Sequence, residues 1–498
     1  MTESRALGAD SRLTRGPAAT LAAAAFVDEL RAAPYLAPWL GVADMAHVAM
    51  MARAGVVEPA TAARLLRGLL AIDEEQLALP LDPEVGDVYN NRDAFLRDRL
   101  GADAGFVHAG RPRREATTLA WQLACRERLV RVGSALAGAV DALIGVASEH
   151  RGTLMPDYTY LQAAQPTTLG HYLLGYVYPL LRDHARLVSA YAVVNRSPAG
   201  SGSVNGSRFA FDREWVAELL GFDSAIPHTR DAMWAPDMAT EQLGALVTTM
   251  TNLDRLAEDT QIWSTAEFGF VELDDGHTRA SVIMPHKKNP YALAWIRGRA
   301  RFLLGRWVGV VGTFLTPSGQ PDNRITAYVE IPAALDDTAL CLELAADVFR
   351  HARFDSERMG AAAHEGYLYT SDLCDLLVER TGIDNRSAHR VVGYAVRECI
   401  AAGGGPLALA DIARAAATLE VELAPIDEAE LDRNRQPEVL IALRQSTGGA
   451  APEPMTRMLE SVTTDVAAVA AHWNDHPILG FRSRFLPAIR TMITELEA

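Results

Sequence analysis

The chain has 498 residues, of which 49% are hydrophobic and 7% aromatic, and its formal net charge is −16. This length allows two or three domains, and the hydrophobic content indicates a large aliphatic core, so disorder along the whole chain is excluded. The acidic balance argues against a general nucleic-acid or membrane surface and favours a small molecule as the partner.

The cysteines and the N-terminal stretch indicate in which cellular compartment the protein is expected. The cysteines lie far apart without paired metal-ligand spacing, and we expect them to be reduced core residues; they are Cys125, Cys341, Cys374 and Cys399. Neither a structural metal nor a cofactor is indicated. The apolar stretch 18–27 is too short to span a membrane and differs from a secretory signal. A cytoplasmic location is therefore expected.

Helical periodicity dominates the middle of the chain. Apolar residues recur every three or four positions at 129–143 and at 243–257, a spacing that predicts long amphipathic helices. A helix over 116–148 would be about 50 Å long, and rods of that length pack as bundles. Their broad apolar faces favour a closed homo-oligomer. The other long helices are predicted at about 167–195, 290–315 and 333–350.

The predicted organisation is an all-α chain with three parts. We expect a helical N-terminal domain at 1–110, a central long-helix bundle domain at 111–360 and a helical C-terminal domain at 361–498. The run 401–406 contains three glycines and a proline, so it is expected to be a loop inside the C-terminal domain. The glycine-rich run 199–206 lacks the spacing of a phosphate-binding loop and is interpreted as a connection near a site.

Lysine is confined to one place in the chain. Only Lys287 and Lys288 occur, side by side, and every other basic residue is arginine. An exposed basic turn in an arginine-biased protein would have the same composition. A compact ammonium group is also what a site requires where a point charge meets a carboxylate. The surrounding segment is therefore the first candidate for chemistry.

Residues 276–288 form a polar, glycine-containing segment that ends where a helix is expected to start. Asn289 is predicted to cap that helix and Pro290 to lie in its first turn. Amide groups at a helix start bind anionic oxygen, and Lys287 adds a full charge. Ser281 lies six residues before Lys287, where nearby cations favour its alkoxide form. We expect an oxyanion site that closes over its substrate.

Two other segments carry candidate ligands. The basic segment 108–115 precedes the first long helix, and its guanidinium groups suit a dicarboxylate, although a solvated helix cap would look the same; the candidates are Arg111, Arg113 and Arg114. The polar segment 155–168 leads into the next long helix. Its candidates are Thr159, Tyr160 and Gln165, each of which is individually also typical of an ordinary loop.

Several motifs together carry a family resemblance. The run Ala-Ser-Val-Ile-Met-Pro-His-Lys-Lys-Asn at 280–289 matches the signature Gly-Ser-Ser-x-Met-Pro-x-Lys-x-Asn. Further matches lie at 165–171, 200–202, 212–214, 267–275, 366–368, 371–373 and 448–452. With these motifs the chain resembles the fumarase/aspartase superfamily and, within it, the argininosuccinate lyase branch, over about residues 85–465.

The resemblance implies a fold and a reaction. The implied fold is an all-helical homotetramer with a twenty-helix core, in which three subunits contribute to each active site. The implied reaction is a reversible elimination that releases fumarate. Ser281 is implied as the base that removes the proton next to a carboxylate, and Lys287, Asn289 and loop amides as the groups that hold the dianionic intermediate. The implied substrate-binding positions are Arg113, Thr159 and Tyr328.

The sequence departs from the argininosuccinate lyase pattern at several site positions. Tyr160 stands where the branch has a histidine, and Ala294 stands where it has the glutamate that orients that histidine. Protonation of the leaving nitrogen must therefore differ, and Tyr160 can act as the acid or as a hydrogen-bond donor. Arg114 replaces a neutral amide. Ala333 and Asp336 fall near the glutamine and lysine that contact the arginine-like end of the substrate.

These departures lead to one main hypothesis and two alternatives. The main hypothesis is a carbon–nitrogen lyase that splits an N-succinyl amine into fumarate and an amine other than arginine, for example one whose extra negative charge pairs with Arg114. One alternative is an argininosuccinate lyase that tolerates the replacements. The other is a catalytically silent homologue with a structural or binding role.

Overall fold

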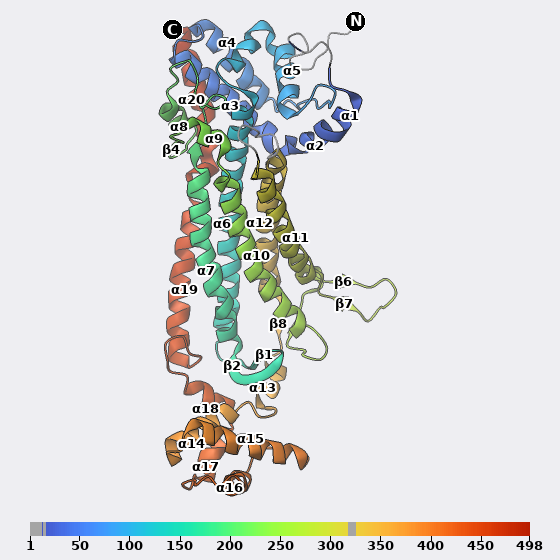
Figure 1. Ribbon diagram of the computed structural model, residues 1–498, viewed down its shortest axis with the longest axis vertical. Helices are drawn as coiled ribbons and strands as arrows, with labels where there is room; N and C mark the ends of the chain where they lie inside the picture. The colour runs from blue at the N-terminus through green and yellow to red at the C-terminus, as the bar shows by residue number, and fades with distance from the viewer. Residues whose placement is uncertain (1–11, 13–15, 317–324) are drawn as a thin grey trace.

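The computed structural model describes residues 12, 16–316 and 325–498, and it is a long, predominantly helical molecule (Figure 1). Long helices run side by side along its axis and confirm the expected all-α fold with a central bundle. These helices are α6 (Arg113–Glu149), α7 (Leu169–Val194), α10 (Asp237–Trp263), α11 (Tyr291–Phe314), α12 (Ala327–His351) and α19 (Pro452–Asn474).

Helix α6 is the centre of the bundle and packs against α3, α7, α12 and α19. It is long and apolar enough to cross a membrane, but 67% of its apolar 18-residue stretch is buried inside the molecule, as in the core helix of a soluble protein. A Cβ at Gly133 of α6 would collide with the indole ring of Trp473 on α19. Glycine at this position therefore permits the close approach of the two helices.

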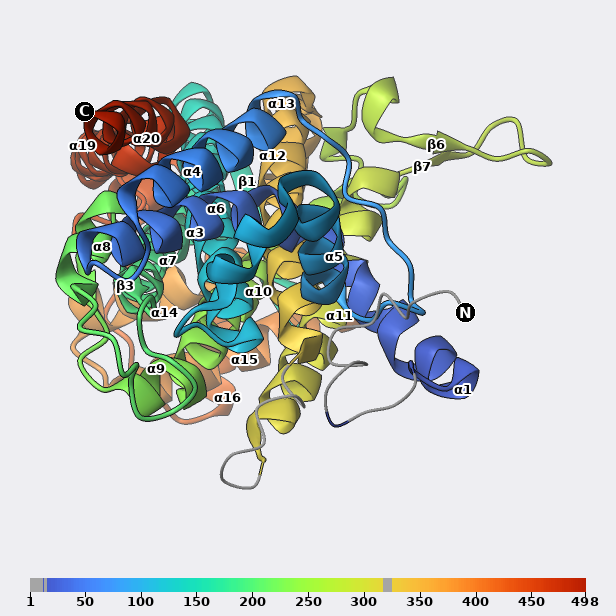
Figure 2. The same cartoon turned by 90° about the horizontal axis from the view of Figure 1, so that it is seen from above.

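One end of the bundle carries a helical block drawn at the top of Figure 1 and seen from above in Figure 2. Its main helices are α3 (Ala33–Arg53), α4 (Pro59–Glu74) and α5 (Val88–Leu100), with short segments at α1 (Ala19–Leu21), α2 (Val27–Glu29), α8 (Arg213–Leu219) and α9 (Thr229–Trp234). The last helix of the chain, α20 (Phe481–Glu497), returns to this block and packs on α4.

The opposite end of the molecule carries a small helical unit with its own apolar core. It comprises α14 (Thr370–Thr381), α15 (Asn385–Ala401), α16 (Leu409–Thr418), α17 (Glu428–Asn434) and α18 (Pro437–Ala442), and α13 (Ser356–His364) leads into it. The predicted loop at 401–406 lies between α15 and α16. Helices α19 and α20 belong to the main core instead, because their apolar faces pack on α6, α7 and α4. The three-domain division of the sequence stays a prediction.

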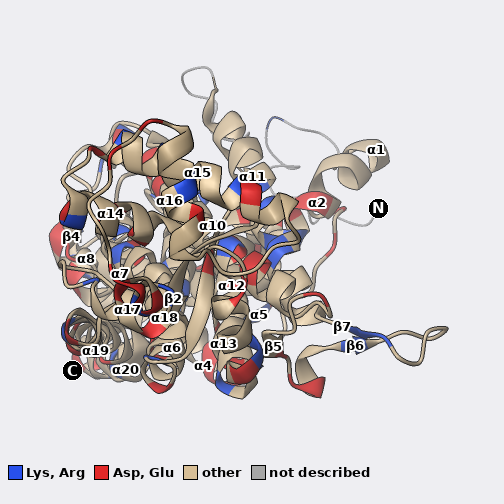
Figure 3. Cartoon of the chain, turned by 90° about the horizontal axis from the view of Figure 1, so that it is seen from below, with Lys and Arg blue, Asp and Glu red and all other residues tan. Residues whose placement is uncertain are grey.

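The strands are short and pair two by two at helix ends. Antiparallel pairs are β1 (Leu154–Thr159) with β2 (Gln162–Thr168), β5 (Val271–Glu272) with β8 (Arg353–Phe354), and β6 (Arg279–Ala280) with β7 (Lys288–Asn289); β3 (Arg196–Ser197) and β4 (Ser224–Ala225) are parallel. The β6–β7 hairpin projects sideways from the bundle (Figures 1 and 2), and its stem is basic (Figure 3).

Candidate active site

The three predicted site segments lie at three separate places on the chain (Figure 1). Arg113 is the first residue of α6, whereas the β1–β2 hairpin follows the far end of this helix. With 37 residues, α6 is about 55 Å long. The third segment, at 281–287, is the tip of the projecting β6–β7 hairpin. One chain therefore does not bring the predicted site residues together.

The arginine segment does form part of a cavity. Arg113, Arg114 and Tyr328 line one hollow, together with Asp87 and Thr117. A guanidinium nitrogen of Arg113 lies 2.7 Å from the Asp87 carboxylate. The Tyr328 hydroxyl lies 3.2 Å from the Thr118 hydroxyl and 3.4 Å from that of Thr117. The two arginines and Tyr328, which the sequence singled out separately, thus lie around one hollow of a single chain.

Arg111 lies apart from this hollow in a buried charge network. Its side chain is 1% exposed, and its guanidinium donates to the Asp44 carboxylate at 2.6 Å and to the backbone oxygen of Ala43 at 3.1 Å. Arg92 binds the other oxygen of Asp44 at 2.6 Å. Burial opposes ionisation of Asp44, but the two guanidinium groups hold its pKa below the ordinary value. Arg111 therefore fixes the segment that precedes α6 to α3, on which Ala43 and Asp44 lie.

The first turn of α6 is held by a carboxylate that sequence reasoning missed. Glu115 is buried, and its two oxygens accept hydrogen bonds from the amides of Gly200 at 2.7 Å and Gly202 at 2.6 Å. Both glycines have positive φ values, 71° and 64°, which few other residues adopt. Burial raises the pKa of Glu115 to about 7, against the opposing effect of these amides and of Arg111. The glycine run at 199–206 thus positions the arginine segment.

The second segment ends in a tight turn. Thr159 pairs with Gln162, and the two residues between them, Tyr160 and Leu161, have φ values of 55° and 57°. Two-residue hairpin turns with both central φ values positive match the twist of the strands, although side chains other than glycine adopt them at a cost. The turn leaves Tyr160 100% exposed. Its hydroxyl is therefore presented outward from this chain.

Gln165 lies further along β2 and links the segment to the distal helical unit. Its side-chain amide donates to the Ser371 hydroxyl at 2.8 Å, and His171 contacts the backbone oxygen of Gly448 at 3.0 Å. These contacts join three of the motifs that carry the family resemblance, at 165–171, 371–373 and 448–452. The sequence did not predict these contacts, because the three motifs are more than 70 residues apart along the chain.

The two lysines of the third segment have different environments. Lys288 lies at the base of the hairpin, with its ammonium 2.8 Å from the Asp275 carboxylate and 3.1 Å from that of Glu272. The hydrogen bond that the Lys288 ammonium donates to Asp275 is the main reason why the pKa of Lys288 is raised. Lys287 is exposed and forms no ion pair with any residue in the described part of the chain. Lys287 is thus the lysine available to a ligand.

Ser281 begins the hairpin tip. Its hydroxyl oxygen accepts a hydrogen bond from the Met284 amide at 3.1 Å, and such a bond favours the alkoxide over the neutral hydroxyl. The cap prediction for Asn289 was wrong. Its side-chain amide donates to the backbone oxygen of Arg279 at 2.7 Å, and Pro290 occupies the N-cap of α11 without a side-chain bond. Strand pairing of Arg279 with Asn289 explains the difference, because it turns the side chain to the hairpin.

Two of the positions where the sequence departs from the family have informative surroundings. Asp336 pairs with Arg128 at 3.2 Å and lies 3.9 Å from Arg131, so its charge is balanced within the chain. Ala294 is exposed one turn into α11 and offers no polar group.

The sequence profile of a family described as "Lyase" matches residues 31–305. The chain belongs to this lyase family. It is 35% identical to the argininosuccinate lyase of Methanoculleus marisnigri, over 84% of this chain and 85% of the relative, and 33% identical to that of Methanothrix thermoacetophila, over the same shares. The lyase therefore lies in the argininosuccinate lyase branch of the fumarase/aspartase superfamily.

Solved structures agree with this placement. The lyase is similar to the crystal structure of EDDS lyase in complex with formate, with a TM-score of 0.85, 27% identity and coverage of 94% of this chain and 92% of that chain. A β-carboxy-cis,cis-muconate cycloisomerase from Acinetobacter calcoaceticus shares the fold at 18% identity and a TM-score of 0.68, covering 90% of this chain and all of that chain. The lyase is thus an enzyme of the fumarate-releasing carbon–nitrogen class.

Proposed function

We propose that the lyase catalyses reversible β-elimination of an N-succinyl amine to fumarate and a free amine. Ser281 removes the proton next to a carboxylate of the succinyl unit. Lys287, Asn289 and amides of the hairpin tip stabilise the resulting aci-carboxylate. Tyr160 assists departure of the nitrogen as an acid or hydrogen-bond donor. The groups proposed to bind the substrate are Arg113, Arg114, Thr159, Gln165 and Tyr328, whereas Arg111, which the sequence also suggested, holds the arginine segment in place through Asp44.

One observation carries this proposal, namely the arrangement of Ser281 and the two lysines on one hairpin. Lys288 is held by Asp275 and Glu272, while Lys287 remains available six residues after the serine. An ammonium without an ion-pair partner among the described residues, on the same hairpin tip as a hydroxyl that already accepts an amide hydrogen bond, favours proton removal and charge stabilisation. The bond between Asn289 and Arg279 must exchange before the Asn289 amide can reach an anion.

The separation of the site segments supports a shared active site in a homotetramer. Arg113, Tyr160 and Ser281 lie on different parts of an elongated chain (Figure 1), so further copies must supply the missing groups. Helix α11 also exposes large apolar side chains, which soluble surfaces normally cover. They are Trp295 at 44%, Phe302 at 55% and Val308 at 64% exposure.

The proposed amine is not arginine. The histidine–glutamate pair of the branch is replaced by Tyr160 and Ala294, and an acid, Asp336, stands near the position of a substrate-contacting lysine. Arg128 balances the charge of Asp336, and Arg114 contributes a guanidinium group to the hollow beside Tyr328. This charge favours an amine with a carboxylate. Similarity to EDDS lyase also supports an amine other than arginine, and a variant of that enzyme has been solved with bound fumarate.

The alternatives are argininosuccinate lyase activity itself and a catalytically silent homologue. The first is favoured by identities of 31–35% to enzymes of that name. The second is favoured by the loss of the histidine–glutamate pair. Each alternative predicts a different outcome when the enzyme is given fumarate and a set of amines.

The test is to incubate the purified enzyme with fumarate and a panel of amines that contains arginine, diamines and amino acids. Loss of fumarate absorbance and formation of an N-succinyl product with a non-arginine amine are expected. Reaction with arginine alone, at ordinary enzymatic rates, would establish the first alternative, and no reaction with any amine would favour the silent homologue. Ser281→Ala is the control, which should lose ~3 orders of magnitude in turnover while still binding fumarate.

A further inference from the structure

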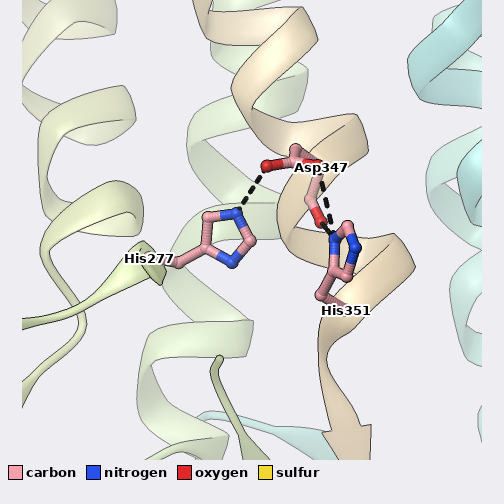
Figure 4. Close-up of side chains that lie close together, drawn as sticks. All are labelled: His277, Asp347 and His351. Carbon is pink, nitrogen blue, oxygen red and sulfur yellow. Dashed lines mark hydrogen bonds and ion pairs between the residues drawn. The ribbon is translucent and has the colours of Figure 1, made fainter. Parts of the chain in front are cut away.

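Three potential metal ligands meet at the root of the β6–β7 hairpin (Figure 4). His277 ends a short 3-10 turn at Asp275–His277, and Asp347 and His351 lie in the last turns of α12. One ligand atom from each residue lies within 4.8 Å of those of the other two. None of the three side chains has a role in the proposed elimination.

The placement of these side chains suits chelation. Asp347 and His351 are four residues apart on a helix, so they lie on the same face one turn apart. Zinc-binding helices use this i,i+4 spacing for two ligands. The third ligand, His277, comes from a different element, so a bound ion would join the hairpin root to α12. Two nitrogens and one carboxylate oxygen suit Zn²⁺, Co²⁺ or Ni²⁺ better than Mg²⁺ or Ca²⁺, which prefer oxygen ligands.

The local contacts show a cluster that is already assembled. His277 Nε2 lies 2.8 Å from Asp347 Oδ2, and His351 Nδ1 lies 3.3 Å from Asp347 Oδ1. The side chain of His277 is only 8% exposed, and its buried Nδ1 has no hydrogen-bond partner among the described residues. Asp347 and His351 are each 56% exposed. An ion would therefore have one buried ligand, two accessible ligands and an open side for water.

Coordination would exchange existing hydrogen bonds rather than require a new fold. His351 Nδ1 is shared between the backbone oxygen of Asp347 at 2.9 Å and its carboxylate. The hairpin root is already fixed to the end of α12 by pairing of β5 with β8, and Arg353 lies 3.6 Å from Glu272. Only side chains would have to move to admit an ion.

We propose that His277, Asp347 and His351 bind one divalent cation of the zinc type per chain. The ion ties the root of the hairpin to α12, and His277 is four residues from Ser281. It therefore stiffens the base of the arm that carries the candidate base and leaves the tip free to close. Cysteine spacing carries no sign of this site, because no cysteine takes part.

The experiment uses the full-length protein after treatment with a chelator and dialysis. Co²⁺ serves as the spectroscopic probe and Zn²⁺ as the calorimetric one. We expect one ion per chain, cobalt absorption bands typical of nitrogen and oxygen ligation, and displacement of Co²⁺ by Zn²⁺. Hydrogen exchange at residues 271–279 should slow when Zn²⁺ binds. All of these readouts are independent of the elimination reaction.

Matched variants decide whether the cluster is the binding site. Asp347→Asn and His351→Ala remove exposed ligands, so both proteins should fold, and each should weaken Zn²⁺ binding by at least ~10-fold. His389→Ala removes an exposed histidine from α15 and should leave binding unchanged. Absence of stoichiometric binding in the wild-type chain would overturn the proposal, and so would Zn²⁺ binding by the two ligand variants as tight as that of the wild type.

Discussion

Lys288 places its ammonium group 2.8 Å from the carboxylate of Asp275, at the stem of the same hairpin on which Lys287 is unpaired within the described chain. Lys288 therefore anchors the hairpin, whereas Lys287 is the lysine that we propose to meet the substrate. The only two lysines of the chain thus differ in their surroundings although they are neighbours in the sequence.

Replacement of each lysine by glutamine separates these roles. Lys287→Gln should lower turnover by ~10²–10³-fold, because a charge aimed at the aci-carboxylate is lost. Lys288→Gln removes an exposed ion pair and should change turnover by less than ~10-fold. Steady-state kinetics of the two variants with the same substrate provide the check. Equal losses would mean that the hairpin does not distinguish its lysines.

Tyr160 provides a test of how the nitrogen departs. Its side chain is fully exposed in the chain, so Tyr160→Phe should leave folding unchanged. If the hydroxyl donates a proton or hydrogen bond to the leaving nitrogen, turnover should fall by ~10²-fold. The effect should be smaller for an amine of lower basicity, because such a leaving group needs less assistance. Wild-type turnover of Tyr160→Phe across an amine series would exclude Tyr160 from the chemistry.

Glu115 makes stability depend on pH. Burial raises its pKa from the ordinary value of 4.5 to about 7, so the folded chain binds more protons than the unfolded chain between these values. This contribution is fully present below pH 4.5 and is lost as the pH rises through 7. Relative to Glu115→Gln, the wild type should lose up to ~3 kcal/mol of unfolding free energy over this range. Urea denaturation at several pH values measures it, and a constant difference would contradict the assignment.

Subunit mixing tests the shared active site. Arg113→Gln and Ser281→Ala each inactivate a different segment, and these segments are separated within one chain. If a site takes its arginine and its serine from different subunits, co-expression of the two variants should restore up to about a quarter of the wild-type activity by random assembly. Failure of stable mixed oligomers to regain activity would place both groups on one chain.

The sequence predicted the long helices well, because their apolar periodicity is strong and their ends are marked. The expected helix at 116–148 lies within α6, and that at 290–315 corresponds to α11. Motif matching singled out Arg113 and Tyr328 separately, and their place in one hollow became visible only in the structure. The helices and these motif matches depend on local pattern or on close similarity to a family.

Other features depended on tertiary contacts that a linear pattern does not encode. The return of α20 to α4 and the contact of Gln165 with Ser371 join segments far apart in sequence. The role of Glu115 required the buried geometry of the glycine run, although the motif at 200–202 was visible. Asparagine is a common helix cap, but Asn289 pairs with Arg279 at the hairpin stem, and its side chain donates a hydrogen bond to the backbone oxygen of Arg279 instead.

A crystal structure of the enzyme with bound fumarate and an unreactive amine tests the central claim most directly. The account predicts that the hydroxyl oxygen of Ser281 lies in contact with the methine carbon that receives the proton. It further predicts that Lys287 reaches the adjacent carboxylate and that Arg113 is supplied by another subunit. A closed hairpin with the Ser281 hydroxyl beyond contact range of that carbon would contradict the proposed chemistry.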